Sequence, residues 1–172
     1  MTPKNKTELV KLIRSEIKKQ GWSANLNHID VSHIDNFCYL FSEVYMLQEF
    51  NGDISRWEMS QAKNFSFMFL ESHFNGDVSG WKVSNVHTME NMFMDSRFNQ
   101  ALESWEVDPR CNTKSMFIGS ELLKSIKVDR EWGQDKKEGM DFWEVRSIWR
   151  GDFLGCALKD TNEENPIKRM RL

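Results

Sequence analysis

Cysteine is scarce in this sequence, and the three that are present, Cys38, Cys111 and Cys156, stand at unrelated spacings. No CxxC pair or Cys/His cluster indicates a disulfide framework or a zinc site, so we expect three buried free thiols. The four histidines share no ligand spacing either. The sequence also lacks the Walker loop and the GxGxxG, GxSxG and HExxH motifs. We therefore predict a protein that is not an enzyme and that carries no metal and no cofactor.

Long hydrophobic runs are missing as well. No stretch approaches the roughly 20 apolar residues of a membrane-spanning helix, and the first residues lack the apolar core of a signal peptide. We therefore expect no membrane association and a location in the cytoplasm of the producing cell. Clustered positive charge is absent from the centre of the chain, where residues 21–120 carry thirteen acidic and six basic side chains. This excess of negative charge argues against nucleic-acid binding and leaves a protein partner open.

The sequence does contain a repeat of 24 residues, which is present three times, at residues 50–73, 74–97 and 98–121. The copies begin FNGDISRWEMS, FNGDVSGWKVS and FNQALESWEVD, and each continues to a Met-Phe pair. A fixed period of this length is typical of solenoids, in which each repeat forms one rung and buries its apolar face against the neighbouring rungs. Partial repeats on either side extend the predicted solenoid to residues 22–128.

Within each copy, apolar residues follow an Lxx-Lx-L order that is typical of leucine-rich-repeat strands. The same order precedes and follows the three copies, so we predict five strands, built on Leu26-x-x-Ile29-x-Val31, Ile54-x-x-Trp57-x-Met59, Val78-x-x-Trp81-x-Val83, Leu102-x-x-Trp105-x-Val107 and Leu123-x-x-Ile126-x-Val128. After each strand the apolar spacing becomes helical, as in Phe65-x-x-Met68-Phe69. The predicted fold is an α/β solenoid: a leucine-rich-repeat-like right-handed coil with a small parallel sheet of about five strands and short helical turns on the other side.

Two helical caps are expected, because the end rungs of a solenoid need cover. At the start, residues 1–21 carry an apolar face with a capping box at Asn5 and Glu8 and a terminating glycine at Gly21. At the end, residues 129–160 contain a helical pattern over Met140–Arg150. Residues 161–172 are polar and are predicted to be a tail, and the whole chain to be one structural domain.

Two features of the repeats allow a second interpretation. The Asn-Gly-Asp triplets at 51–53 and 75–77 could suggest calcium, but one carboxylate per rung is too few for a cation that takes six to eight oxygens, and turn chemistry explains them. The column Trp57, Trp81 and Trp105 could be a ligand platform. Its apolar neighbours favour a place in the core.

The residues interleaved with the buried ones would face outwards from the predicted sheet and form one candidate partner-binding face: His28, Asp30, Arg56, Glu58, Lys82, Glu106 and Lys127. The alternative for these residues is an inert, solvated ladder. A second candidate is an aromatic patch in the C-terminal segment, since Trp is favoured at binding hot spots: Trp132, Trp143 and Trp149. The alternative for that patch is a cap over the last rung.

The run FNGDVSGWKVSNVHTMENMF resembles the repeat of BspA-family bacterial surface proteins, and the likeness covers residues 7–120. The resemblance implies a non-enzymatic, leucine-rich-repeat-like module of the kind found in surface or adhesive proteins. By itself it would suggest the cell surface, whereas the N-terminal sequence suggests the cytoplasm.

We therefore expect a protein–protein interaction module of bacterial or phage origin that binds a partner through one of these two surfaces. A sharper version makes it an effector or a phage-encoded inhibitor of a host or defence protein. The alternatives are an enzyme with a site between the last repeat and the C-terminal segment, and an adhesive or structural surface fragment. The sequence leaves the partner and the oligomeric state open.

Overall fold

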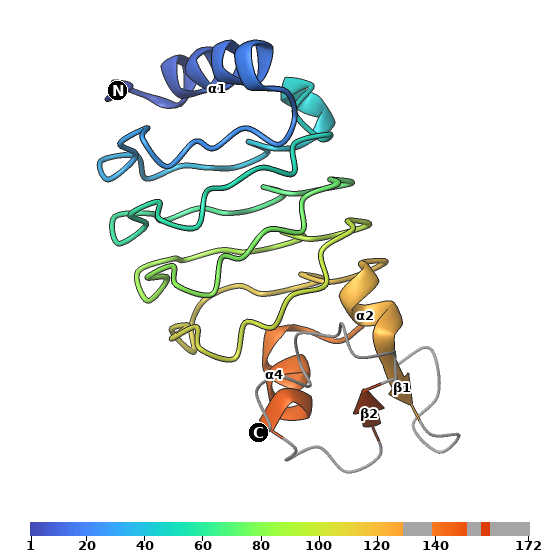
Figure 1. Ribbon diagram of the computed structural model, residues 1–172. Helices are drawn as coiled ribbons and strands as arrows, with labels where there is room; N and C mark the ends of the chain where they lie inside the picture. The colour runs from blue at the N-terminus through green and yellow to red at the C-terminus, as the bar shows by residue number, and fades with distance from the viewer. Residues whose placement is uncertain (129–138, 151–155, 159–172) are drawn as a thin grey trace.

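A computed structural model describes residues 1–128, 139–150 and 156–158. The chain winds into a stack of rungs, one for each repeat, between a long helix at one end and short elements at the other (Figure 1). The elements are α1 (Lys6–Gln20), the 3₁₀ helix η1 (Glu43–Tyr45), α2 (Glu121–Ser125), β1 (Ile126–Val128), α4 (Phe142–Arg150) and β2 (Cys156–Leu158).

The N-terminal helix forms as predicted. The side chain of Asn5 accepts a hydrogen bond from the Glu8 amide at 3.0 Å, and Gly21, with a φ of +83°, ends the helix. Leu9 and Ile13 are fully buried against the first rung. From the polar face of α1, Lys6 donates to the Cys38 carbonyl at 3.1 Å. The helix therefore covers the first rung through both apolar and polar contacts.

The predicted fold class is wrong, because the repeats form no parallel sheet. In the part of the chain that the structure describes, the strands are β1 and β2, which pair antiparallel outside the three repeats. Successive rungs are joined instead by isolated parallel bridges, such as Asn64 to Thr88. The Lxx-Lx-L segment is broken by tight turns, in which the Trp57 amide donates to the Ile54 carbonyl and the Ala62 amide to the Met59 carbonyl. Such turns cannot belong to an extended strand.

The short helical turns predicted after each strand are also wrong. Phe67 and Glu71 have φ values of +58° and +54°, and the equivalent residues of the next two rungs are left-handed too. Along this segment, every second backbone amide closes a turn within its own rung. The amides between them donate to carbonyls of the next rung, as the Phe69 amide does to the Met92 carbonyl at 2.9 Å. The i, i+3, i+4 apolar spacing fits these overlapping turns as well as it fits a helix. Among the described residues, a 3₁₀ helix is found only in the first rung, which is longer than the others and holds η1 between Ser42 and Leu47.

The core is a set of aromatic columns along the stack. The indole N–H groups of Trp57, Trp81 and Trp105 each donate to a carbonyl of the preceding rung, at 3.0, 3.1 and 2.9 Å. All three side chains are buried, which confirms their predicted place in the core. A second column contains phenylalanine rings at 5.3 to 5.9 Å from one rung to the next: Phe41, Phe69, Phe93 and Phe117. This packing holds the rungs in register without a continuous sheet.

At the other end, the fifth predicted rung is replaced by α2 and β1, so no strand of the predicted parallel sheet forms there. The helix expected over Met140–Arg150 is present as α4. Phe142 lies against Trp105 of the last full repeat, with ring centroids 6.5 Å apart. The helix α4 thus covers the end of the aromatic core. The division of the chain into two caps, a repeat region and a tail stays a prediction.

Candidate functional site

The members of the first predicted binding face whose side chains the structure describes are exposed, and two of them form an ion pair with each other. Glu58 and Lys82 lie on neighbouring rungs with 3.6 Å between carboxylate and ammonium. The Ser60 amide donates to the Glu58 carboxylate and lowers its pKa. Lys82 and Glu106 line a shallow hollow of about 400 Å³. The structure therefore brings Glu58, Lys82 and Glu106 together along a row of turns rather than on a sheet.

His28 and Asp30 make their contacts elsewhere, with the N-terminal segment and the first rung. His28 is 3.7 Å from Glu16 of α1, a carboxylate whose pKa is lowered mainly by a hydrogen bond from Lys19. Asp30 accepts hydrogen bonds from Ser32, which lower its pKa. His28 and Asp30 therefore belong to the junction between the N-terminal segment and the first rung. Arg56 is exposed beside Trp57, and the side chain of Lys127 lies outside the described part of the chain.

Of the C-terminal aromatic patch, Trp149 is buried rather than exposed. Trp149 is only 4% exposed and packs edge-on against Phe117, so it belongs to the core. Trp143 is partly buried, and the guanidinium carbon of Arg146 lies 5.8 Å from its ring centroid. Trp132 lies outside the described residues. The interpretation of Trp149 as part of an exposed patch is therefore wrong, because the α4 face that carries it points into the stack.

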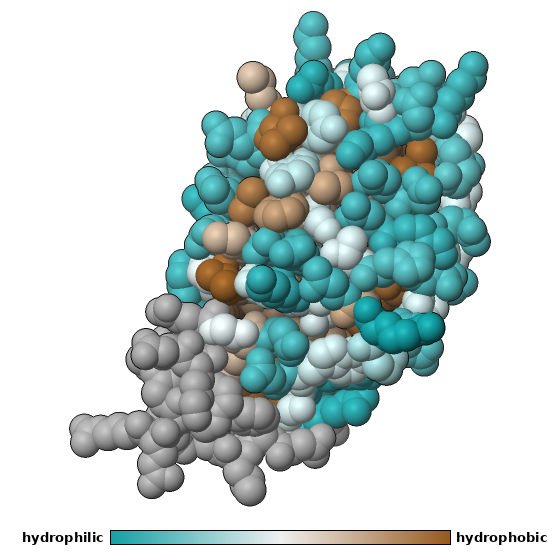
Figure 2. Space-filling view, turned by 180° about the vertical axis from the view of Figure 1, so that it is seen from behind, coloured by the Kyte–Doolittle hydropathy of each residue, from teal (hydrophilic) through white to brown (hydrophobic). Residues whose placement is uncertain are grey.

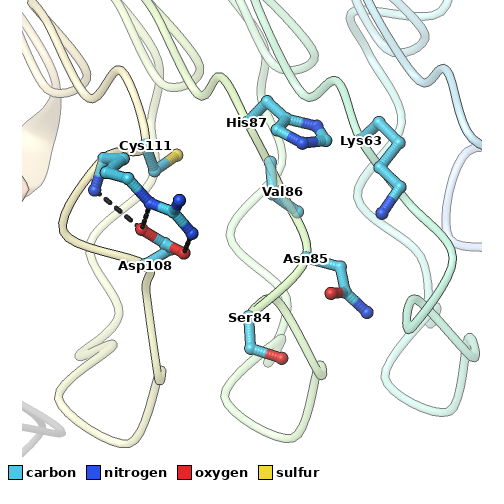
Figure 3. Close-up of a pocket in the computed structure, with 8 residues that line it drawn as sticks. Lys63, Ser84, Asn85, Val86, His87, Asp108 and Cys111 are labelled. Carbon is cyan, nitrogen blue, oxygen red and sulfur yellow. Dashed lines mark hydrogen bonds and ion pairs between the residues drawn. The ribbon is translucent and has the colours of Figure 1, made fainter.

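A hollow of about 270 Å³ opens where Lys63, His87 and Cys111 occupy the same position of three successive rungs (Figure 3). Arg110 donates two side-chain hydrogen bonds to Asp108, at 3.0 and 2.7 Å, and holds the pKa of that carboxyl well below its usual range. Burial raises the pKa of the Cys111 thiol to about 11. A thiol with this pKa is protonated near neutral pH, so Cys111 is not an activated nucleophile.

A polar ladder runs along another edge of the rungs. The Asn51 side chain accepts a hydrogen bond from the Asn75 amide, and the Asn75 side chain accepts one from the Asn99 amide, both at 2.8 Å. Beside this ladder, His73 and Glu49 form a pair at 2.7 Å. The asparagines of the repeat therefore join rungs to one another. In the described ranges 1–128, 139–150 and 156–158, no group of three or more His, Cys, Asp or Glu side chains is placed to hold a metal ion.

The most distinctive exposed feature is a row of apolar side chains on the edge of the stack where η1 lies. Leu70, Met94 and Ile118 take the same position of three successive rungs and are half-buried. At the top of the row, Val44 is 63% exposed and lines a hollow together with Leu70. Seen from behind, brown side chains form a broken line along this side of the stack (Figure 2). We call Val44, Leu70, Met94 and Ile118 the apolar row.

Carboxylates accompany the apolar row. Glu43, Glu71 and Asp95 each directly precede or follow a member of the row in sequence and are exposed. Within the described residues, none of these three side chains forms an ion pair or accepts a hydrogen bond. They differ in this respect from Glu58, which is paired with Lys82. The surface therefore combines one exposed and three half-buried apolar side chains with carboxylates that no side chain of the described residues neutralises.

The sequence prediction missed the apolar row, although a signal for it was present. The buried Met-Phe pair of each copy is followed directly by a third apolar residue, Leu70, Met94 or Ile118. In the predicted helical turn, this residue would simply face solvent, and nothing would distinguish it from other surface residues. Only the left-handed turns show that the three residues line up from rung to rung.

Comparison with known proteins places most of the chain in one family. The model of a family described as "Mycoplasma protein of unknown function, DUF285" matches residues 10–130. No curated protein and no solved structure matches the chain. No helix among the described residues is long and apolar enough to cross a membrane.

Proposed function

The chain belongs to the DUF285 family of Mycoplasma proteins of unknown function, and we propose that this member is a non-enzymatic module that binds another protein through its apolar row. The observation that carries the proposal is the alignment of Val44, Leu70, Met94 and Ile118 beside unpaired carboxylates. Apolar side chains that line up on a surface, with charged groups at the rim, are typical of protein interfaces.

The rigidity of the stack supports this role. Amides on both sides of the row are tied to the next rung, as in the hydrogen bond from Glu71 to the Met94 carbonyl at 2.9 Å and that from Asp95 to the Ile118 carbonyl at 2.7 Å. Each of Leu70, Met94 and Ile118 directly follows a phenylalanine of the buried column in sequence. A surface held in this way loses little conformational entropy when a partner binds. The resemblance to BspA-family repeats favours the same class of function.

The polar face around Lys82 is a weaker candidate. Lys82 already pairs with Glu58, so a partner that binds these two side chains would have to replace an interaction that the protein already makes. The hollow beside Cys111 is a weaker candidate for chemistry, because its thiol is protonated and its carboxylate is occupied by Arg110. An enzymatic role therefore finds less support in the described residues than a binding role.

Photo-crosslinking in the cells that produce the protein tests the proposal. p-Benzoylphenylalanine would replace Met94 in one full-length variant and Lys82 in a second, and the products would be identified by mass spectrometry. We expect the Met94 variant to capture one discrete protein that the Lys82 variant does not. Capture from Lys82 alone would move the interface to the polar face. Capture from neither position would contradict the proposal.

A further inference from the structure

We propose that the partner presents an amphipathic α-helix, which lies along the apolar row parallel to the stack axis and carries Lys or Arg beside its apolar stripe. This inference rests on the proposed function and specifies the shape and charge of the occupant. Three features support it: the spacing of the core column beside the row, the main-chain amides of the row, which already donate hydrogen bonds, and carboxylates without a partner among the described residues.

The core column next to the row has a spacing close to one turn of an α-helix. The phenylalanine immediately before each of Leu70, Met94 and Ile118 in sequence belongs to the core column, whose rings are 5.3 and 5.9 Å apart between these rungs. An α-helix repeats one face about every 5.4 Å, whereas an extended strand repeats one face about every 6.6–6.8 Å. At the spacing of this column, a helix can place about one apolar residue per turn against each rung, whereas the repeat of a strand is longer than the spacing.

The main chain of the row argues against an added strand. The Leu70 and Met94 amides donate within their own rungs, to the Phe67 and Asn91 carbonyls, both at 3.2 Å. The Met94 carbonyl accepts from the Glu71 amide, and the Ile118 carbonyl accepts from the Asp95 amide. Each donor lies in the preceding rung. Strand addition needs free main-chain donors and acceptors along an edge. Since these amides are already bonded, an added strand could not pair with them. The occupant must therefore be recognised through its side chains, as an amphipathic helix is recognised when it binds in a groove.

The carboxylates beside the apolar row favour an occupant with positive charge. Glu43 and Glu71 line the same hollow as Val44 and Leu70, and Asp95 follows Met94. Because these carboxylates have no cationic partner within the described residues, a helix with lysine or arginine beside its stripe would gain ion pairs without breaking existing ones. A helix with acidic flanks would be repelled.

Designed peptides provide the direct test, with fluorescence anisotropy as the measurement on the full-length protein. The probe is a stapled 16-residue helix with leucine at positions i, i+4, i+7 and i+11 and lysine beside them. One comparison peptide has glutamate in place of lysine, and another has the lysine sequence with a central proline and no staple. We expect the lysine helix to bind about tenfold or more tightly than either comparison peptide.

Charge reversal on the protein makes the test specific to this surface. The variant Glu43→Lys/Glu71→Lys should weaken binding of the lysine helix about tenfold and favour the glutamate helix. The matched control Glu58→Lys/Glu106→Lys changes the net charge equally on the polar face and should leave the affinity within about twofold. Circular dichroism would establish that both variants keep the parent fold.

The outcomes separate this inference from the proposed function. Equal binding of the proline peptide would overturn the helix, and equal binding of the glutamate helix would overturn the charge selection. Absence of peptide binding, together with a protein captured from Met94, would overturn the helical occupant and leave the binding function standing. Absence of capture from Met94 would remove the proposed function itself.

Discussion

Replacing Gly52 with alanine should test how closely the rungs approach one another. A Cβ atom at this position would lie 2.1 Å from the Ala24 carbonyl oxygen, 2.9 Å from the Ala24 nitrogen and 2.7 Å from a ring carbon of Phe50. Two of these three contacts are with main chain, so no side-chain rotation can relieve them. Gly80 is the matched control, because a Cβ atom there would meet nothing within 4 Å.

The magnitude follows from what must move. To accommodate the methyl group, the main chains at Gly52 and Ala24 must separate by about 1 Å, an overpacking that typically costs about 1–3 kcal/mol. The movement lengthens the hydrogen bond from the Asp53 amide to the Ala24 carbonyl, now 3.1 Å, and strains that from the Leu26 amide to the Asp53 carbonyl. Each such bond contributes about 0.5–1.5 kcal/mol. We expect Gly52→Ala to lower the free energy of unfolding by about 2–5 kcal/mol.

Urea denaturation followed by tryptophan fluorescence measures this difference. Gly80→Ala should change the free energy of unfolding by no more than about 1 kcal/mol, because it only restricts the unfolded chain. The m-value should stay the same in both variants. If the two variants differ by less than about 0.5 kcal/mol, the rungs are not packed as closely as the structure has them at residues 24 and 52, and the reasoning fails.

Two further predictions concern the core. Trp81→Ala should cost about 3–5 kcal/mol in urea denaturation, because it empties a buried site and leaves the Ile54 carbonyl without its indole donor. Trp22→Ala, at a side chain that is 44% exposed, should cost far less, and equal losses would contradict the core position of Trp81. The second prediction is pH-dependent: because burial raises the pKa of Cys111 to about 11, the folded state holds this proton more tightly than the unfolded state, whose thiol titrates near pH 8.5. Stability should therefore fall between about pH 8.5 and 11, by about 1–3 kcal/mol more in the parent protein than in Cys111→Ala, and parallel curves for the two proteins would refute the assignment.

The features best predicted from the sequence were those with local causes. The N-terminal helix followed from its apolar spacing, its Asn5 cap and Gly21, and α4 followed from the spacing of Phe142, Val145, Ile148 and Trp149. The burial of the tryptophan column followed from its position among other apolar residues. These patterns depend on one element at a time, so the sequence was sufficient to recognise them.

The errors arose where one pattern fits two backbone paths. An Lxx-Lx-L order buries the same residues in a strand as in two successive tight turns, and the spacing of Phe65, Met68 and Phe69 suits a helix as well as overlapping left-handed turns. Sequence carries little warning of the second path, since Phe67 has no intrinsic preference for a φ of +58°. The contacts with neighbouring rungs, not the local sequence, stabilise that conformation.

By itself, the sequence determined the 24-residue period, the identity of the core columns and the helices that cover the two ends, because each depends on residue type and spacing along the chain. The tertiary structure alone decided that rungs are joined by single bridges and turns rather than by strands. It also decided which polar residues are already paired and that Val44, Leu70, Met94 and Ile118 form one row beside carboxylates that have no partner among the described residues. Those properties depend on how one rung lies against the next, and the spacing of residues within a rung does not specify that contact.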